Sequence, residues 1–457
     1  MAGIGFTLRR LLGSDGLSGP LQAFAYATVI SSGPWLTSSL ALAMLGTWSA
    51  LTPGGQATDV FLAIVSYCFA FSLVGVGVCQ MVASRYLADR LYEDRPDTFA
   101  PAFAQLLMPL LGAQLVVSAT FAACVPLPLL VKVAAVTLYL ALNGTWLAMV
   151  FLSAAHDFKA IAWAFAIGWG LSLALGLSGS HTAGLEGQIT GFAAGAAFTF
   201  FALLARLDRE FGVPRRSAPE LGAYFGRYWP LVVTGVAYNL GIWIDKIVFW
   251  YTDGPGHAVA GPLRAAPVYD NAMFLAYMTI IPALALFLLK VETDFYDEYR
   301  AYFSAIAARE GLGVLLAVKA RMAAVLRESL GLLVKLQGTL TLAIVLLAPE
   351  ITAALKISWL SLFVFRVGVI GAFLHVLHLT VMILLLYFDF RKEAAALAVV
   401  FLASNWLFSI LSVTQAGLAA YGFGYAVASA VTLLFGLALL EANLRDLEYH
   451  VFMKQPL

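Results

Sequence analysis

Long apolar stretches alternate with short polar or charged stretches along almost the whole chain. About 20 apolar residues are needed for a helix to cross the hydrocarbon layer of a membrane, so each such stretch predicts one span. The predicted spans are residues 20–47, 58–82, 103–124, 127–152, 160–178, 186–205, 228–251, 270–291, 331–349, 358–388, 393–414 and 418–440. The pattern therefore predicts an all-α polytopic membrane protein with 12 transmembrane helices.

The composition supports this class. Hydrophobic residues make up 61% of the 457 residues and charged residues only 12%. That charged share is about half of the share usual in a soluble domain. A chain with this much apolar surface is expected to use a bilayer, not one water-soluble core, to cover it.

The positions of Lys and Arg predict the orientation, because cytoplasmic loops of membrane proteins carry an excess of both. If the N-terminus is cytoplasmic, most of the 27 basic residues fall in inner loops and tails. Outer loops then hold only Lys132, Arg264 and Lys356, and Lys246 and Arg366 lie within spans. This alternation predicts that both termini are cytoplasmic.

A basic stretch at 206–227 separates the first six predicted spans from the last six. This division predicts two six-helix lobes around a central cavity, as in transporters built from repeats. The predicted parts are a cytoplasmic amphipathic segment (1–19), the N-lobe (20–205), a cytoplasmic basic linker (206–227), the C-lobe (228–440) and a cytoplasmic tail (441–457).

Residues 292–330 of the C-lobe are too charged to form a span. Phe295, Tyr299, Tyr302 and Phe303 fall on one face of a helix there. We expect one or two amphipathic helices that rest on lipid headgroups at the cytoplasmic surface. A surface that docks a protein partner is the alternative interpretation.

The first span contains the unusual stretch ISSGPWLTSSL at 30–40. Gly33 and Pro34 predict a helix kink, because proline donates no backbone hydrogen bond and displaces the preceding turn. A tryptophan and several hydroxyls beside such a kink suit a path for a neutral sugar, and the candidates are Ser31, Ser32, Trp35 and Ser38. A plain helix–helix contact through small residues would give the same pattern, so both interpretations stay open.

Three more pairs of polar residues at membrane depth are candidates for the same path. They are Asn143 with Trp146, Tyr238 with Asn239, and His375 with His378. The two histidines share a helix face, where they can relay protons, bond a sugar or simply bond neighbouring helices.

Asp245 and Lys246 lie within the seventh span, and Arg366 lies at a similar depth in the tenth. Neighbouring residues on a helix point about 100° apart, so Asp245 and Lys246 are not an ideal pair. We therefore expect Asp245 to approach Arg366 and brace an outer gate. The alternative is that Lys246 and Arg366 extend to the outer headgroups.

Several kinds of chemistry have no motif in this sequence. It has no GxxxxGK[ST], HExxH or GxSxG, and nothing in it predicts an enzyme, a cofactor or a metal site. Cys68, Cys79 and Cys124 lie in apolar runs without a CxxC pair, which predicts buried thiols. Gly191 and Gly195 form GxxxG, which predicts a close helix contact.

Five stretches, in this order, resemble one known family. They are MAGIGFTLRRLL, YATVISSGPW, SRYLADRLYE, NLGIWIDKIVFW and ETDFYDEYRAYF, which begin at residue 1 and end at about 303. They look like the PelG family, the inner-membrane transporters of Pel exopolysaccharide in the multidrug/oligosaccharidyl-lipid/polysaccharide flippase superfamily.

The resemblance implies a two-lobed transporter of the bacterial inner membrane that works by alternating access. It also implies export to the periplasm of a polymer rich in N-acetylgalactosamine, as in a biofilm matrix. The partners that it implies are PelD, a cyclic-di-GMP receptor, PelE, and the cytosolic glycosyltransferase PelF.

Two other functions remain open at the level of sequence. One is a lipid-linked oligosaccharide flippase or ion-coupled exporter of the same superfamily, although acidic residues in the middle of spans are scarce. The other is a membrane acyltransferase that uses His375 or His378.

Overall fold

The computed structural model describes residues 10–11, 18–51, 55–212, 218, 220–355, 357–415 and 417–454. Most of the predicted amphipathic segment 1–19 lies outside the described residues, as do Lys356 and parts of the linker and of the tail. Nearly all of the described chain is helical, and its one sheet is a two-stranded hairpin. The predicted all-α membrane fold is thus confirmed.

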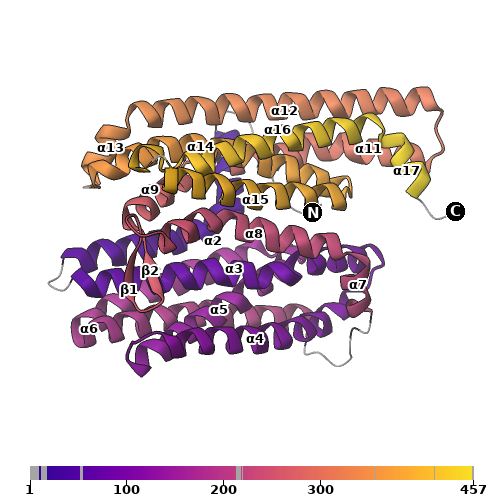
Figure 1. Cartoon of the computed structure of the whole chain (residues 1–457). Helices are drawn as coiled ribbons and strands as arrows, with labels where there is room; N and C mark the ends of the chain where they lie inside the picture. The colour runs from indigo at the N-terminus through magenta and orange to yellow at the C-terminus, as the bar shows by residue number, and fades with distance from the viewer. Residues whose placement is uncertain are drawn as a thin grey trace.

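The first half of the chain forms the N-lobe, the lower layer in Figure 1. Its helices are α2 (Ser18–Leu51), α3 (Gly55–Tyr92), α4 (Phe99–Cys124), α5 (Leu129–Ala154) and α6 (Phe158–Phe211), with a short 3₁₀ turn at Pro96–Thr98. The short helix α7 (Leu221–Arg227) follows within the predicted linker.

The second half forms the C-lobe, which begins with α8 (Trp229–Tyr251) and the hairpin strands β1 (His257–Ala260) and β2 (Leu263–Ala265). The chain continues through α9 (Pro267–Met278), α10 (Ile281–Lys290), a π-helical turn (Val291–Phe295), α11 (Tyr296–Ala307), α12 (Leu312–Leu346) and α13 (Ala348–Ala354). It ends with α14 (Trp359–Tyr387), α15 (Arg391–Gln415), a 3₁₀ turn (Gly417–Ala420), α16 (Phe423–Arg445) and α17 (Leu447–Lys454).

The long helices of both lobes run roughly side by side, so the bundle has two ends (Figure 1). We call the end that carries β1 and β2 the hairpin end, and the opposite end the α7 end. Across the lobe boundary α3 packs against α8 and α2 packs against α10. The boundary therefore uses the first two long helices of the N-lobe together with α8 and the short helix α10 of the C-lobe.

Eleven of the described helices are long and apolar enough to cross a membrane, one fewer than the twelve predicted spans. The fifth and sixth predicted spans both lie in α6, which has non-helical backbone angles at Ala183 and Gly184. A Cβ placed on Gly187 would lie 2.1 Å from the carbonyl oxygen of Gly179, so the two halves of α6 fold back on each other.

The GxxxG motif lies in this fold-back, and the predicted close helix contact is confirmed. A Cβ on Gly191 would lie 2.4 Å from the backbone of Leu175, and one on Gly195 would lie 2.3 Å from the backbone nitrogen of Ser172. Backbone atoms cannot move aside as a flexible side chain can. Both positions therefore require glycine.

We expect Gly195→Val to destabilise the N-lobe by at least about 1–3 kcal/mol, the usual cost of overpacking a well-packed interior. The thermal unfolding midpoint of the purified protein measures the loss. Gly170→Val on the same helix is the matched control, because a Cβ there meets nothing within 4 Å. Equal midpoints for the two variants would contradict the prediction.

The predicted surface segment 292–330 is helical, but it does not form separate helices lying across the bundle end. It continues the neighbouring spans as α11 and the first half of α12, which run along the bundle in Figure 1. With 35 residues, α12 is about 50 Å long, more than the hydrocarbon layer needs. Its charged first half can thus extend beyond the membrane on the same helix.

The aromatic face of this segment is packed inside the protein. Phe295 and Tyr302 are fully buried, and the Phe295 ring contacts the rings of Tyr387 and Phe388. The expectation that these aromatic rings rest on lipid or dock a partner is therefore wrong. The sequence pattern marked an apolar face correctly but did not identify what covers it.

An apolar cavity of about 200 Å³ lies near the hairpin end between α3, α4 and α5 of the N-lobe, and Tyr251 and Leu263 of the C-lobe also line it. Its walls include Tyr67, Cys68, Phe121 and Tyr139.

Of the three cysteines, Cys68 and Cys79 are buried as predicted, whereas Cys124 is exposed. Cys124 is the last residue of α4, so the apolar run around it ends at a helix terminus instead of in the core.

Candidate functional site

The boundary between the lobes is the first part of the candidate site, and α3 and α8 approach very closely there. A Cβ on Gly235 would lie 2.2 Å from the carbonyl oxygen of Gly77, and one on Gly77 would lie 2.7 Å from that of Gly235. The Nδ2 group of Asn239 donates a hydrogen bond of 2.9 Å to the carbonyl oxygen of Leu73. The predicted path residue Asn239 thus bonds one lobe to the other.

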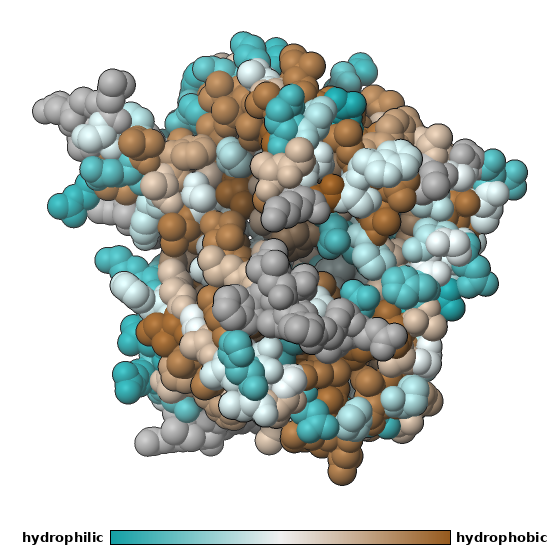
Figure 2. All heavy atoms as spheres, turned by 90° about the vertical axis from the view of Figure 1, so that its left-hand side faces the viewer, coloured by the Kyte–Doolittle hydropathy of each residue, from teal (hydrophilic) through white to brown (hydrophobic). Residues whose placement is uncertain are grey.

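At the hairpin end, aromatic side chains close the boundary. The Tyr67 ring stacks on Trp250 with 4.6 Å between ring centroids, and the Tyr67 hydroxyl bonds that of Tyr251 at 3.3 Å. The backbone nitrogen of Arg264 in β2 donates to the Tyr67 hydroxyl at 3.3 Å. The C-lobe hairpin therefore contacts the N-lobe at this end of the molecule. Figure 2 shows the same end facing the viewer.

At the α7 end, charged residues make the contact between the lobes. Asp389, in the turn between α14 and α15, accepts from Arg85 of α3 at 3.4 Å and from Arg391 at 2.9 Å. Both guanidinium groups also lie over the Tyr228 ring, at 5.4 and 4.5 Å from its centroid. We call Arg85, Tyr228, Asp389 and Arg391 the α7-end latch.

The end of α3 also holds the linker helix α7. Arg90 is 6% exposed, and its guanidinium bonds Glu93, Glu220 and the hydroxyl of Tyr224. Burial raises the pKa of the Tyr224 hydroxyl, which stays protonated and donates to Asp89 at 3.1 Å. This cluster fixes the chain where it passes from one lobe to the other.

We expect Arg85→Gln and Asp389→Asn each to weaken the α7-end latch and to lower the stability of the protein only slightly, because both side chains are partly exposed. A double-mutant cycle on the two residues should give a coupling free energy of about 0.2–1 kcal/mol, the usual value for an exposed ion pair. The free energies of unfolding of the purified single and double variants measure this coupling. Strictly additive effects would contradict an ion pair between the two residues.

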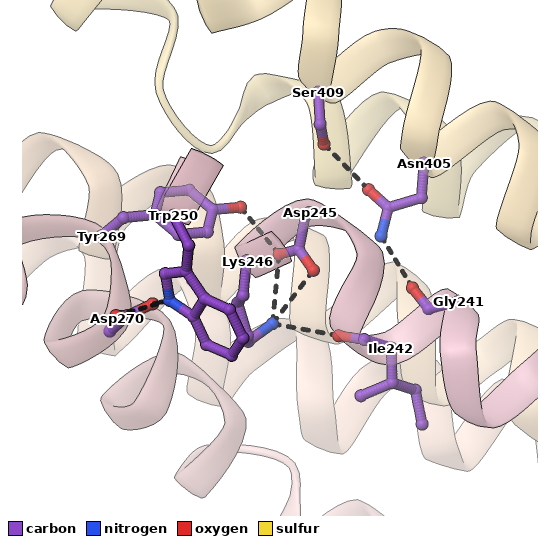
Figure 3. Close-up of polar contacts among 9 residues, drawn as sticks. All are labelled: Gly241, Ile242, Asp245, Lys246, Trp250, Tyr269, Asp270, Asn405 and Ser409. Atoms are coloured by element: carbon purple, nitrogen blue, oxygen red, sulfur yellow. Dashed lines mark hydrogen bonds and ion pairs between the residues drawn. The ribbon is translucent and has the colours of Figure 1, made fainter. Parts of the chain in front are cut away.

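The interior of the C-lobe holds the second part of the candidate site (Figure 3). Lys246 Nζ donates to both carboxylate oxygens of Asp245 at 3.1 Å and to the carbonyl oxygen of Ile242 at 3.0 Å. Tyr269 of α9 donates to Asp245 at 2.8 Å. Contrary to the prediction, the two neighbours on α8 pair directly, because the long Lys246 side chain folds back over its own helix.

Arg366 does not reach this pair. Its Nε donates to the carbonyl oxygen of Val345 in α12 at 3.2 Å. The predicted pairing of Asp245 with Arg366 is therefore wrong in this structure. The sequence gives a comparable depth for the two residues but not the directions in which they point.

Four other polar residues surround this pair and were not singled out from the sequence. Asp270 accepts from Trp250 Nε1 at 3.0 and 2.9 Å, and Asn405 donates to the carbonyl oxygen of Gly241 at 2.8 Å. Ser409 bonds Asn405 at 3.2 Å, and Tyr269 bonds Asp245. Asn405 and Ser409 could have been found from the sequence, because each is a polar residue in the middle of a long apolar run.

The two histidines lie on α14 within the same lobe. The Nε2 atom of His375 bonds the hydroxyl of Tyr238 at 3.1 Å, and the His375 and His378 rings are 4.6 Å apart. Their exposures are only 2% and 1%. The structure thus brings together the predicted path residues Tyr238, His375 and His378, inside the C-lobe and not in the N-lobe.

The other predicted path residues lie in the N-lobe. Ser31 and Ser32 bond each other at 3.2 Å, and Ser38 donates to the carbonyl oxygen of Trp35 at 2.9 Å. These hydroxyls bond within α2, which stays helical through Gly33 and Pro34.

The remaining pair lies on α5. Asn143 is fully buried and donates to the carbonyl oxygen of Tyr139 at 2.9 Å. Trp146 donates to the hydroxyl of Ser72 in α3 at 3.0 Å. Both residues therefore face polar atoms of their own lobe, and the structure does not join them to Tyr238.

The fold is similar to that of solved MATE-type transporters. A "MATE in the bent conformation" has a TM-score of 0.66 at 14% identity, covering 97% of this chain and 98% of that one. The inward-facing "multidrug resistance MATE family transporter of the MOP superfamily" has a TM-score of 0.62 at 13% identity, covering 97% and 99%. A MOP superfamily transporter from Pyrococcus furiosus has a TM-score of 0.58 at 16% identity, covering 97% of this chain and 99% of that one.

Residues 1–452 match the family described as "PelG: Putative exopolysaccharide Exporter (EPS-E)". The chain belongs to this family. A comparison with curated proteins finds no match. Family and fold together identify a multi-pass membrane transporter and give no support to the acyltransferase alternative.

Proposed function

We propose that this chain exports a Pel-type polysaccharide, rich in N-acetylgalactosamine, from the cytoplasm to the periplasm across the bacterial inner membrane. The observation that carries the proposal is the presence of two separate closures between the lobes. Aromatic residues with the β-hairpin hold one end, and the α7-end latch holds the other. Breaking one closure while keeping the other would expose the boundary to one side at a time.

The proposed orientation rests on the distribution of basic residues. With the α7 end in the cytoplasm, Arg85, Arg90 and Arg391 lie on the side where basic residues are enriched. Both termini are then cytoplasmic. A synthesising enzyme on that side would deliver polymer to the boundary at the α7 end.

The proposed partners are PelD, PelE and the glycosyltransferase PelF. They come from the family resemblance alone, and the buried aromatic face of α11 is no longer a candidate surface for them. The exposed, charged side of α11 and α12 stays available, since the Arg300 and Arg327 side chains are not buried.

The test uses inverted inner-membrane vesicles that contain the full chain and the glycosyltransferase, with a labelled sugar nucleotide outside. We expect labelled polymer inside the vesicles, protected from an added hydrolase, and none in vesicles without this chain. Polymer that is made but remains accessible outside would contradict the proposal. Transfer of a labelled lipid-linked oligosaccharide instead would favour the flippase alternative.

A further inference from the structure

The Lys246 ammonium group lies in a setting that resembles a binding site for a free cation. Its ligands are the two carboxylate oxygens of Asp245 and the carbonyl oxygen of Ile242, at 3.0 to 3.1 Å. Around them stand the rings of Tyr277, Trp243 and Tyr425, whose centroids lie 4.9, 5.6 and 6.0 Å from Nζ. Carboxylate, carbonyl and aromatic faces are all groups that stabilise a desolvated cation.

The pair is almost completely removed from solvent, with Asp245 0% and Lys246 6% exposed. A carboxylate at this depth needs a positive charge close by, because its own desolvation is costly. No other cationic side chain forms an ion pair with Asp245 among the residues that the structure describes. The Asp245 carboxylate thus depends on the Lys246 ammonium group for a compensating positive charge.

We propose that Asp245, the Ile242 carbonyl and the surrounding rings form a monovalent-cation site that the chain fills with its own Lys246 ammonium. An ammonium group is similar in size and charge to a potassium ion, so the same ligands suit either. Because the lysine is tethered, the site holds its cation without taking one from solution. If the proposed export function holds, transport does not require a free sodium or potassium ion to bind at this site.

If Asp245 and Lys246 formed only an ordinary buried ion pair, shortening the lysine should have a different effect. Lys246→Ala leaves the Asp245 carboxylate, the Ile242 carbonyl and the three rings in place, with space where the ammonium group was. A site for a cation then becomes loadable from solution, whereas an ion pair alone is simply broken. If particular small monovalent cations restore the stability of Lys246→Ala, the site is a cation site and not merely an ion pair.

The experiment measures the thermal unfolding midpoint of the purified full chain in detergent, in potassium, sodium, ammonium or N-methylglucamine chloride at equal ionic strength. We expect the wild type to have the same midpoint in all four salts. Lys246→Ala should have a lower midpoint in N-methylglucamine and recover roughly 5 °C in potassium or ammonium, because a ligand that binds only the folded state stabilises it. Lys246→Ser replaces the alanine variant if that variant is not recovered folded.

The matched control is Asp245→Asn/Lys246→Met, which removes both charges and should show no dependence on the cation. A shortened variant that responds equally to all four salts would overturn the proposal, and so would a wild-type midpoint that rises selectively with one cation. Because the readout is unfolding and not export, failure of the proposed transport function would leave these results unchanged.

Discussion

The Gly235→Val variant is expected to lose at least about 90% of its polysaccharide export, because valine cannot fit where α8 crosses α3. The added Cβ would lie 2.2 Å from the Gly77 carbonyl oxygen, and the obstacle is backbone. Overpacking of this kind typically costs about 1–3 kcal/mol. Because about 1.4 kcal/mol corresponds to a factor of ten in an equilibrium constant, this cost is enough to reduce the population of the closely packed lobe boundary about tenfold. Secreted polymer, corrected for the amount of the protein in the membrane, measures the effect.

The effect should depend on the lobe boundary and not on valine in a helix as such. Gly226→Val on α7 is the matched control, because a Cβ there meets nothing within 4 Å. We expect nearly normal export from the control. Normal export from Gly235→Val, with the protein present at its usual level, would mean that the close approach of α3 and α8 is not needed for transport.

Much of the fold could be predicted because apolar length and charge are local properties of the sequence. The break between the third and fourth predicted spans matches the gap between Cys124 and Leu129, where the chain turns from α4 to α5. The fold-back within α6 and the continuation of α12 beyond its predicted span could not be predicted in the same way. A helix end depends on backbone angles at a few residues, such as Gly184, and on what the neighbouring helices cover.

The candidate site was less predictable, since it depends on directions that only the packed helices define. The polar residues Tyr238, Asn239 and His375 were recognised from their depth alone. Asn239 proved to bond the other lobe, whereas Tyr238 and His375 bond each other within the C-lobe. A one-residue change in helix phase would exchange these roles without changing the hydrophobic pattern.

The hydroxyls of the first span illustrate the same limit. Ser38 and Thr37 bond carbonyl oxygens of their own helix, which is the common behaviour of these residues in apolar surroundings. The sequence alone could not separate that role from a sugar path. The predicted path through Ser31, Ser32, Trp35 and Ser38 therefore stays a prediction.

The largest effect on stability is expected at Asp245. Asp245→Ala leaves the Lys246 ammonium group buried without its carboxylate, which typically costs about 3–5 kcal/mol. Replacing both residues by apolar ones, as in Asp245→Ala/Lys246→Met, removes both buried charges and should be much less harmful. We therefore expect a double-mutant cycle on this pair to give a coupling free energy of at least about 2 kcal/mol, measured by unfolding of the purified variants.

The same cycle with Arg366 separates the observed pairing from the one that the sequence suggested. Arg366 bonds the carbonyl oxygen of Val345 and shares no ligand with Asp245, so the free-energy changes of Asp245→Ala and Arg366→Ala should simply add. Coupling between Asp245 and Arg366 that exceeds the coupling between Asp245 and Lys246 would mean that the carboxylate exchanges partners in another state of the transport cycle. Additive effects in the Arg366 cycle, together with strong coupling in the Lys246 cycle, would identify the ammonium group as the charge that keeps Asp245 stable inside the C-lobe.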